Sequence, residues 1–390
     1  MSSTKEKLRT GFPIFFAAVN MRGGIVLIAP LVPILKDYFN LSNFAISLLA
    51  GIPVLCFSGS AIFMPRIARL GSSNRIIKIA LTTLTIGLIA RAITGLPGLY
   101  LFTFLIGIAI AIMNYELPTW VKEHAPEDTG FMTGVYVTVM GIFAGISVAV
   151  AVPLAHLNSW SWRMSMVPWI VLAIFASIYW NTRKDHVKTI EEKVTKPFWK
   201  SKAFKNPIAW ALMLFFGLQS VTFYATSTWL PTILTTKGFT LGEGALYLSV
   251  AGIIGSVIGL TAPHHLNKIK DKRPILVSLA ALQILGFFMM TIQTGPILFV
   301  WMIVTNIGLS IQFPVSLMLA GVKSTSLEGT RTLSTMMQSL GYLIAAAGPA
   351  FMASLFDLTS SWNWALGGIM FICFIQLLVS MVVGKESVID

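Results

Sequence analysis

The chain alternates between long apolar runs and short polar breaks from one end to the other. A helix that rises 1.5 Å per residue needs about 20 mainly apolar residues to cross a hydrocarbon core of roughly 30 Å. The pattern therefore predicts an all-α membrane protein with about twelve transmembrane helices. The predicted crossings lie near residues 12–36, 44–65, 75–95, 98–120, 131–155, 163–181, 207–234, 244–264, 274–293, 296–320, 332–356 and 362–383.

The composition agrees with this prediction and excludes a soluble protein. Hydrophobic residues make up 55% of the chain and charged residues only 11%, whereas a soluble domain carries roughly 25% charged residues. A net charge of +13 would favour nucleic-acid binding in a soluble protein. Here the basic residues lie between the apolar runs and not along one face, so we expect a lipid bilayer, and no nucleic acid, as the partner.

The distribution of lysine and arginine predicts the orientation in the membrane. If the N-terminus lies inside, only four basic residues fall on the outside: Lys36, Arg91, Arg163 and Lys237. All the other polar segments with basic residues, including the long stretch from Arg183 to Lys205, fall on the cytoplasmic side. The positive-inside rule then places both termini of this multi-pass protein in the cytoplasm, and an even number of crossings agrees with termini on the same side.

One sizeable polar stretch, residues 182–206, separates the sixth and seventh predicted crossings. We interpret it as a cytoplasmic linker between an N-terminal six-helix bundle (1–181) and a C-terminal one (207–390). The two halves repeat some features: "LVPIL" precedes the second crossing as "WLPTIL" precedes the eighth. Internal repeats of this kind place the substrate site of many transporters at the midplane, between the halves.

Several motifs carry a resemblance to a known family. They are "VNMRGGIVLIAPLVPIL" (19–35), "NYELPTWVK" (114–122), "MTGVYVTVMG" with "VPLAHLNSWSWR" (132–163), "GLQSVTFYATSTWLPTIL" (217–234) and "RTLSTMMQSLGYLIAAAGP" (331–349). With these motifs the chain resembles the cyanate permease and 2-nitroimidazole transporter family of the major facilitator superfamily. The resemblance implies two pseudo-symmetric six-helix bundles, residence in a bacterial inner membrane, and transport of small solutes.

The general superfamily signature after the second crossing is degenerate in this chain. Pro65 stands where that signature has an acid, whereas the corresponding loop of the second half keeps Asp271, Lys272 and Arg273. The sequence therefore gives no support for a gating salt bridge in the first half like that of distant superfamily members.

Arg22 is the clearest candidate for a functional residue. It lies about ten residues into the first crossing, or about 15 Å deep, where a charged group costs roughly 2.5–3.5 kcal/mol on insertion scales. One interpretation is a fixed cation that faces a water-filled path and binds an anion through its planar fork of donors. The alternative is an internal ion pair or carbonyl clamp, for which Glu116 is the plausible acidic partner.

The resemblance implies that crossings one, four, seven and ten line the central path, and most intramembrane polar residues fall on these segments. Tyr224 and Trp229 suit a flat ligand because each has an apolar body and one polar tip. Helix packing or an interfacial aromatic belt is an equal alternative for Trp229. The predicted substrate-binding residues are Arg22, Asn20, Asn114, Gln219, Tyr224, Trp229, Asn306 and Gln312, with Gln338, Tyr342 and Tyr136 from crossings eleven and five.

Glu116 has two interpretations that the sequence leaves open. Burial raises the pKa of a carboxyl group and a nearby cation lowers it, so Glu116 is a candidate for coupling transport to protons. It is equally compatible with a structural pair with Lys122 or another basic group at the cytoplasmic mouth.

The sequence contains no nucleophile arrangement and no phosphate-binding glycine loop, so we expect neither a cofactor nor ATP as the energy source. His264 and His265 are adjacent but lack further ligands at metal-binding spacing, and Cys56 and Cys373 lie apart within apolar runs. We expect no metal site and a monomeric protein.

These observations predict a secondary transporter and not an enzyme. We expect uptake of a small polar solute, anionic or nitrogen-containing, by alternating access and with possible proton coupling. The alternative is an efflux pump for drug-like heteroaromatics such as nitroimidazoles. A membrane sensor or a membrane-embedded enzyme is a remote third hypothesis, because no reactive cluster or sizeable soluble domain is present.

Overall fold

The computed structural model describes residues 4–67, 71–125, 129–183 and 198–389, and within them every regular element is a helix. The N-terminal half contains α1 (Thr4–Asn20), α2 (Gly23–Val26), α3 (Ile28–Phe39), α4 (Asn43–Ile67), α5 (Ser73–Ile93), α6 (Leu96–His124), α7 (Thr129–Ala155), η2 (Ser161–Met166) and α8 (Val167–Thr182). The C-terminal half contains η3 (Phe198–Lys200), η4 (Ala203–Lys205), α9 (Pro207–Thr235), α10 (Leu241–Asn267), α11 (Arg273–Ile292), α12 (Ile297–Val322), α13 (Leu327–Ala345), α14 (Gly348–Thr359) and α15 (Trp362–Val383).

The number of crossings agrees with the hydropathy pattern. Eleven segments of the described chain are long and apolar enough to cross a bilayer, and α4 adds a further helix whose apolar part covers Asn43–Gly59. The first crossing, Gly11–Phe39, is built from α1, α2 and α3, and the eleventh, Glu328–Thr359, from α13 and α14. The predicted all-α membrane fold is confirmed.

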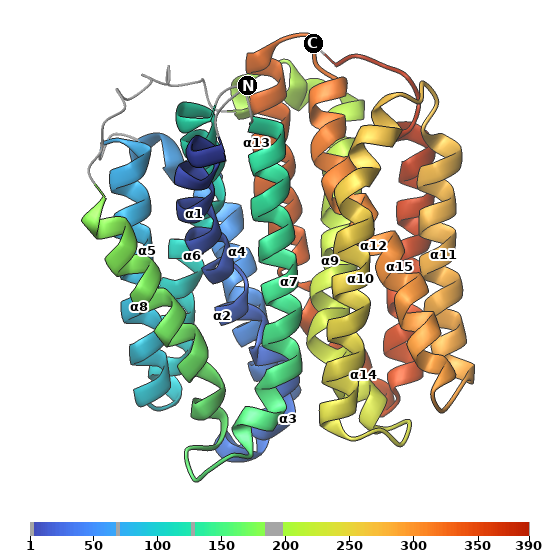
Figure 1. The fold of residues 1–390 in the computed structure, drawn as a ribbon. Helices are drawn as coiled ribbons and strands as arrows, with labels where there is room; N and C mark the ends of the chain where they lie inside the picture. The colour runs from blue at the N-terminus through green and yellow to red at the C-terminus, as the bar shows by residue number, and fades with distance from the viewer. Residues whose placement is uncertain (1–3, 68–70, 126–128, 184–197, 390) are drawn as a thin grey trace.

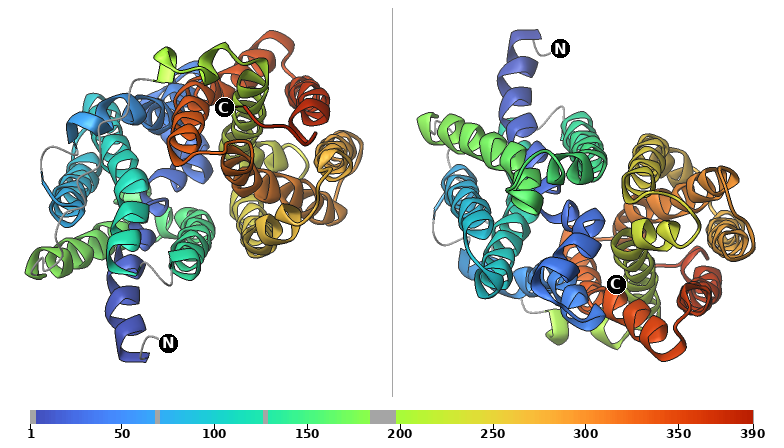
Figure 2. Two further views of the ribbon diagram at one scale, coloured as in Figure 1. Left: turned by 90° about the horizontal axis from the view of Figure 1, so that it is seen from above. Right: turned by 90° about the horizontal axis from the view of Figure 1, so that it is seen from below.

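The helices form two bundles that lie side by side (Figures 1 and 2). Helices α1–α8 make up the first bundle and α9–α15 the second, and the start of α1 and the end of α15 lie at the same end of the molecule. Helix α4 packs against α13 and α14, and α7 packs against α10, so these helices join the two bundles. Residues 184–197 of the predicted linker lie outside the described residues.

Small residues bring the two bundles into close backbone contact. The Ser58 hydroxyl donates a hydrogen bond to the Ser339 carbonyl (2.6 Å), and the Ser249 hydroxyl donates one to the Gly145 carbonyl (2.7 Å). At Gly51 of α4, a Cβ atom would lie 2.8 Å from the backbone carbonyl oxygen of Ala346, which directly follows α13. Hydrogen bonds between small residues are a common way for membrane helices to associate, because lipid removes the hydrophobic drive between them.

Candidate substrate-binding site

A break in the first crossing carries Arg22. Helix α1 ends at Asn20 and α2 begins at Gly23, and Arg22 between them has φ −128° and ψ −37°, outside the helical region. Gly23 packs directly on the indole of Trp169, and a Cβ atom at this position would lie only 2.4 Å from the ring. The close packing of α2 on α8 thus fixes the chain immediately after Arg22.

Two side chains of the same bundle hydrogen-bond to backbone carbonyls next to this break. The Ser147 hydroxyl on α7 donates to the Gly23 carbonyl (2.8 Å), and Nη2 of Arg91 on α5 donates to the Gly24 carbonyl (2.6 Å). Both donors are buried. Backbone carbonyls at a helix break in a membrane need such partners, because lipid offers none.

The Arg22 guanidinium lies between the two bundles and against aromatic rings of the second one. Its central carbon is 5.6 Å from the ring centroid of Phe223 on α9 and 5.9 Å from that of Phe313 on α12, which are cation–π distances. Among the residues that the structure describes, no carboxylate lies within 4.0 Å of Arg22. The Arg22 charge is therefore balanced by ring faces in this structure and not by an acidic side chain.

Tyr342 lies at the centre of a group of rings next to Arg22. Its ring centroid is 4.9 Å from Phe216, 5.5 Å from Phe57 and 6.4 Å from Tyr224. Phe57 belongs to α4 of the first bundle, so the rings cross the interface between the bundles. We call this group the aromatic cluster; its members are Phe57, Phe216, Phe223, Tyr224, Phe313 and Tyr342.

Several predicted residues lie at or beside this cluster. Tyr224 and Tyr342 belong to it. Gln338 precedes Tyr342 by one turn of α13, is half-buried and has no hydrogen-bond partner among the described residues. Gln219 precedes Phe223 by one turn of α9 and is buried, with its amide nitrogen 2.6 Å from the Ser220 hydroxyl.

Other predicted residues instead make contacts within their own bundle. The Trp229 indole donates to the Pro349 carbonyl (2.9 Å) and lies against the Trp362 ring, which matches the helix-packing interpretation. Asn306 donates to the Met302 carbonyl of its own helix (3.0 Å). Asn20 donates to the Phe16 carbonyl one turn back (2.8 Å).

Gln312 belongs to a buried network of amides. Its Oε1 accepts hydrogen bonds from the side-chain nitrogens of Gln283 on α11 and Gln376 on α15, both at 2.7 Å. All three side chains are fully buried. The Gln312 amide thus faces the interior of the second bundle in this structure. Its neighbour in the chain, Phe313, contacts Arg22 instead.

The remaining predicted residues lie on α6 and α7 of the first bundle. Glu116 is buried, with 3% of its surface exposed, whereas Lys122 is exposed. Asn114, on the same helix, is exposed, and Tyr136 on α7 packs against the hydrophobic core. The roles proposed for these residues stay predictions.

Sequence reasoning missed the phenylalanine rings that contact Arg22. It considered only polar and amphipathic side chains as ligands, although Phe223 directly precedes Tyr224 and follows Gln219 by one helical turn. The helical spacing of Phe216, Gln219 and Phe223 could have indicated one shared face of α9. The packing of the second bundle against Arg22 could not have been read from this spacing.

No metal site stands out in the described part of the chain, where no group of three His, Cys, Asp or Glu side chains comes together. Cys56 and Cys373 are both buried and free. Their burial agrees with their interpretation as buried small side chains.

A family model described as "Major Facilitator Superfamily" matches residues 14–349. The chain belongs to the major facilitator superfamily. Among its superfamily relatives, an uncharacterized transporter, YycB, of Bacillus subtilis is 31% identical and the match covers 90% of this chain and 87% of YycB. The 2-nitroimidazole transporter of Escherichia coli is 27% identical over 96% of this chain and 95% of its own. The cyanate transport protein CynX of Escherichia coli is 24% identical, over 93% of each chain.

Solved structures of other transporters share the fold of this major facilitator protein. A D-xylose-proton symporter superposes with a TM-score of 0.74 at 16% identity and covers 97% of both chains. The nucleoside transporter NupG superposes with a TM-score of 0.76 at 13% identity, over 97% of this chain and 99% of its own. The fold and the family are those of multi-pass membrane transporters of small molecules.

Proposed function

We propose that this protein is a secondary transporter that takes up a small polar solute, anionic or nitrogen-containing, and leaves it chemically unchanged. Arg22 holds the negative end of the solute while the two bundles rock around it. The names of two relatives, a 2-nitroimidazole transporter and a cyanate transport protein, support a compact, nitrogen-containing solute. The protein works as a monomer in a bacterial inner membrane, with both termini in the cytoplasm, and Glu116 is the candidate for proton coupling.

The observation that carries this proposal is the position of the Arg22 guanidinium. It is half-buried between the bundles, and its described neighbours are ring faces of Phe223 and Phe313. A guanidinium has five donors and no acceptor, and ring faces satisfy none of these donors as a carboxylate would. A solute with a negative or strongly accepting end supplies the missing acceptors and gains a charge-assisted pair in a site of low dielectric.

A position between the bundles also suits alternating access. Arg22 belongs to the first bundle, whereas Phe223, Tyr224 and Phe313 belong to the second. A solute bound to Arg22 therefore contacts both bundles at once. Binding can then favour the state in which the bundles close around the solute, as transport requires.

The test is solute binding to the purified protein, measured by calorimetry with cyanate and 2-nitroimidazole as probes. For Arg22→Gln we expect roughly 10- to 100-fold weaker binding of the probe that the wild type binds, because hydrogen bonds to charged groups contribute about 1.5–3 kcal/mol. Arg22→Lys should recover part of the loss, since it keeps the charge but not the planar fork.

Arg163→Gln is the matched control. Arg163 also lies against aromatic rings, 4.5 Å from Trp162 and 5.3 Å from Tyr38, but it belongs to η2, away from the interface between the bundles. Its loss should leave probe binding unchanged. Equal binding by wild type and Arg22→Gln would contradict the proposal.

The aromatic cluster favours a second candidate function, export of planar heteroaromatic compounds. Six rings meet at the interface between the bundles, and ring faces stack on flat ligands. Growth of cells with and without the protein in 2-nitroimidazole separates the two functions. An exporter protects the cells, whereas an importer sensitises them.

A further inference from the structure

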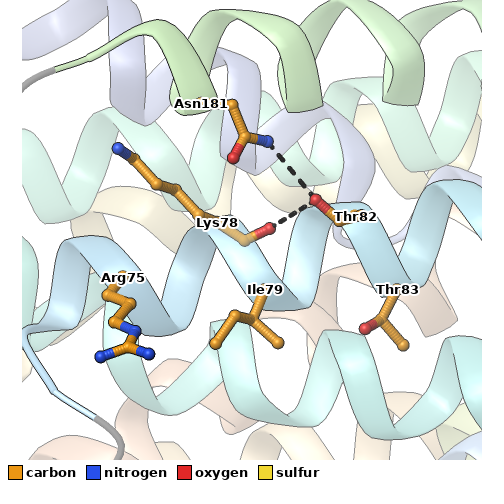
Figure 3. A pocket seen from close by; sticks show the side chains of 6 residues that line it. All are labelled: Arg75, Lys78, Ile79, Thr82, Thr83 and Asn181. Atoms are coloured by element: carbon orange, nitrogen blue, oxygen red, sulfur yellow. Dashed lines mark hydrogen bonds between the residues drawn. The ribbon is translucent and has the colours of Figure 1, made fainter.

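A cavity outside the interface between the bundles lies on the outer surface, between α5 and α8 (Figure 3). It has a volume of about 320 Å³ and is lined by Arg75, Lys78, Ile79, Thr82, Thr83 and Asn181. Five of the six lining residues belong to α5, and Asn181 comes from the last turn of α8. Arg75, Ile79, Thr82 and Asn181 are exposed, so the cavity opens to the surroundings of the protein.

The lining carries two positive charges and no negative one. The Lys78 ammonium donates one hydrogen bond to the Arg183 carbonyl (2.6 Å), which leaves two of its donors for other partners. The Arg75 guanidinium has no hydrogen-bond partner or ion pair among the described residues. The cavity therefore presents unsatisfied donors that suit an anion with several oxygen acceptors.

Hydrogen bonds between the two helices give the cavity a fixed polar wall. The Thr82 hydroxyl on α5 lies 3.2 Å from the Ser177 hydroxyl on α8, and the Asn181 amide donates to Thr82 (3.4 Å). The Asn181 amide also donates to the Ser177 carbonyl of its own helix (2.8 Å), which fixes its orientation. Along α5 the same outer face becomes apolar, with Ile79 44% exposed and Ile86 55% exposed. The two charged groups stand at the start of α5, and the exposed apolar side chains Ile79 and Ile86 follow on the same face, with the Thr82 hydroxyl between them.

A phospholipid likewise has its charge at one end and apolar chains beyond it. Arg75 and Lys78 lie in the first two turns of α5, and Asn181 lies in the last turn of α8, at one end of the first bundle. The basic loops predict that this end faces the cytoplasm, where anionic lipids attract basic residues near the membrane surface. Basic pockets between membrane helices on that side are suited to phosphate headgroups.

We propose that the cavity between α5 and α8 binds an anionic phospholipid of the cytoplasmic leaflet. The phosphate of the headgroup accepts hydrogen bonds from Arg75 and Lys78, and one acyl chain lies along Ile79 and Ile86. This site is separate from the solute site at Arg22 and does not depend on which solute is transported.

Native mass spectrometry of the full-length protein, released from detergent in the presence of phosphatidylglycerol or phosphatidylcholine, tests this proposal. We expect retained phosphatidylglycerol on the wild type, and about ten-fold weaker retention on the double variant Arg75→Gln/Lys78→Gln. Thr83→Phe, which fills the cavity but keeps both charges, should also lose the lipid. Glycerol 3-phosphate, which offers the phosphate without acyl chains, should not compete at equal concentration.

The double variant Lys268→Gln/Lys270→Gln is the matched control. These exposed lysines lie in the loop between α10 and α11, so this variant removes the same charge from the other bundle. It should retain phosphatidylglycerol as the wild type does. Equal losses in the two double variants, equal retention of phosphatidylcholine, or full retention by Thr83→Phe would overturn the proposal.

Discussion

Within the crossings, the first bundle encloses cations where the second encloses a network of amides; the buried lysines of the second bundle, Lys272 and Lys323, lie at its rim. The first bundle buries cations: Arg91 is fully buried, and Arg22 is half-buried at its inner surface. The second bundle buries amides, with Gln283, Gln312 and Gln376 all inaccessible to solvent. An amide both donates and accepts, so the three amides hydrogen-bond to one another, and only Nε2 of Gln312 and Oε1 of Gln376 in this network lack a partner. A guanidinium only donates and must find an acceptor elsewhere.

The difference suggests a division of work between the bundles. The amides of the second bundle tie α11, α12 and α15 together, and this bundle then presents neutral rings to the interface. In the first bundle Arg91 donates to the Gly24 carbonyl next to the helix break. Arg22, at the break itself, makes no hydrogen bond to another described residue, and in our proposal its donors bind the solute. We therefore expect charge recognition from the first bundle and a rigid neutral wall from the second.

The strongest test of this comparison is Gln312→Leu. The substitution leaves the amide donors of Gln283 and Gln376 without their shared acceptor, and each unsatisfied buried donor costs about 1–3 kcal/mol. We expect the free energy of unfolding to fall by about 2–6 kcal/mol, measured by denaturation in detergent. Solute affinity, corrected for the folded fraction, should stay unchanged. A loss of affinity without a loss of stability would instead show that Gln312 contributes to solute binding.

Arg91→Met sharpens the comparison from the side of the first bundle. Nε and Nη1 of Arg91 have no hydrogen-bond partner, so the side chain is an incompletely compensated buried cation. Replacing such a charge by an apolar side chain of similar length is often neutral or stabilising, by about 1–4 kcal/mol in known cases. We expect the melting temperature to hold or rise.

The transport rate should nevertheless fall in Arg91→Met, because the Gly24 carbonyl next to Arg22 loses its donor. Arg91→Lys should restore part of the rate, since an ammonium can still donate to that carbonyl. A lower melting temperature together with unchanged transport would show that Arg91 serves stability alone.

Lys323 gives a smaller, pH-dependent test at the rim of the second bundle, just after α12. It is 2% exposed, and its ammonium donates to the Lys385 carbonyl (2.9 Å) and the Ser387 hydroxyl (2.8 Å) of the C-terminal segment. Burial, and then the nearby charge of Lys272, lowers the pKa of Lys323 from 10.5 to about 8. Between these values the unfolded chain binds more protons than the folded one, so stability rises with pH across this window.

We therefore expect the wild type to gain stability relative to Lys323→Met as the pH rises from 8 to 10.5. Below pH 8 the difference between the two proteins should be constant, because Lys323 is then protonated in both states. Thermal unfolding of both proteins at a series of pH values provides the measurement. A difference that is independent of pH would mean that Lys323 titrates as an exposed lysine does.

Asp271→Asn should have the smallest effect. Asp271 forms an ion pair with Arg273 at 2.8 Å, and this pair holds the pKa of the Asp271 carboxyl at about 2. Both side chains are about half exposed (49% and 47%), so water and salt screen the pair. We expect no measurable change in melting temperature at pH 7. This result would show that an exposed ion pair contributes less to stability than the buried polar groups compared above.

The same ion pair bears on the superfamily signature of the second half. Asp271 pairs with Arg273, two positions further on at the start of α11, so both partners belong to the second bundle. In this structure it therefore makes no bridge between the bundles. The sequence could show that the acid was retained, but only the coordinates show its partner.

The sequence by itself determined the solvent of this protein and the number of its crossings. Hydropathy is a sum of local transfer free energies, so runs of apolar residues are readable without a partner, and the cost of Arg22 in hydrocarbon is readable in the same way. Only the tertiary structure decided which way each polar side chain faces. Gln312 and Phe313 are neighbours in the chain, yet one joins an amide network and the other contacts Arg22, because the rotation of α12 is set by its packing against other helices.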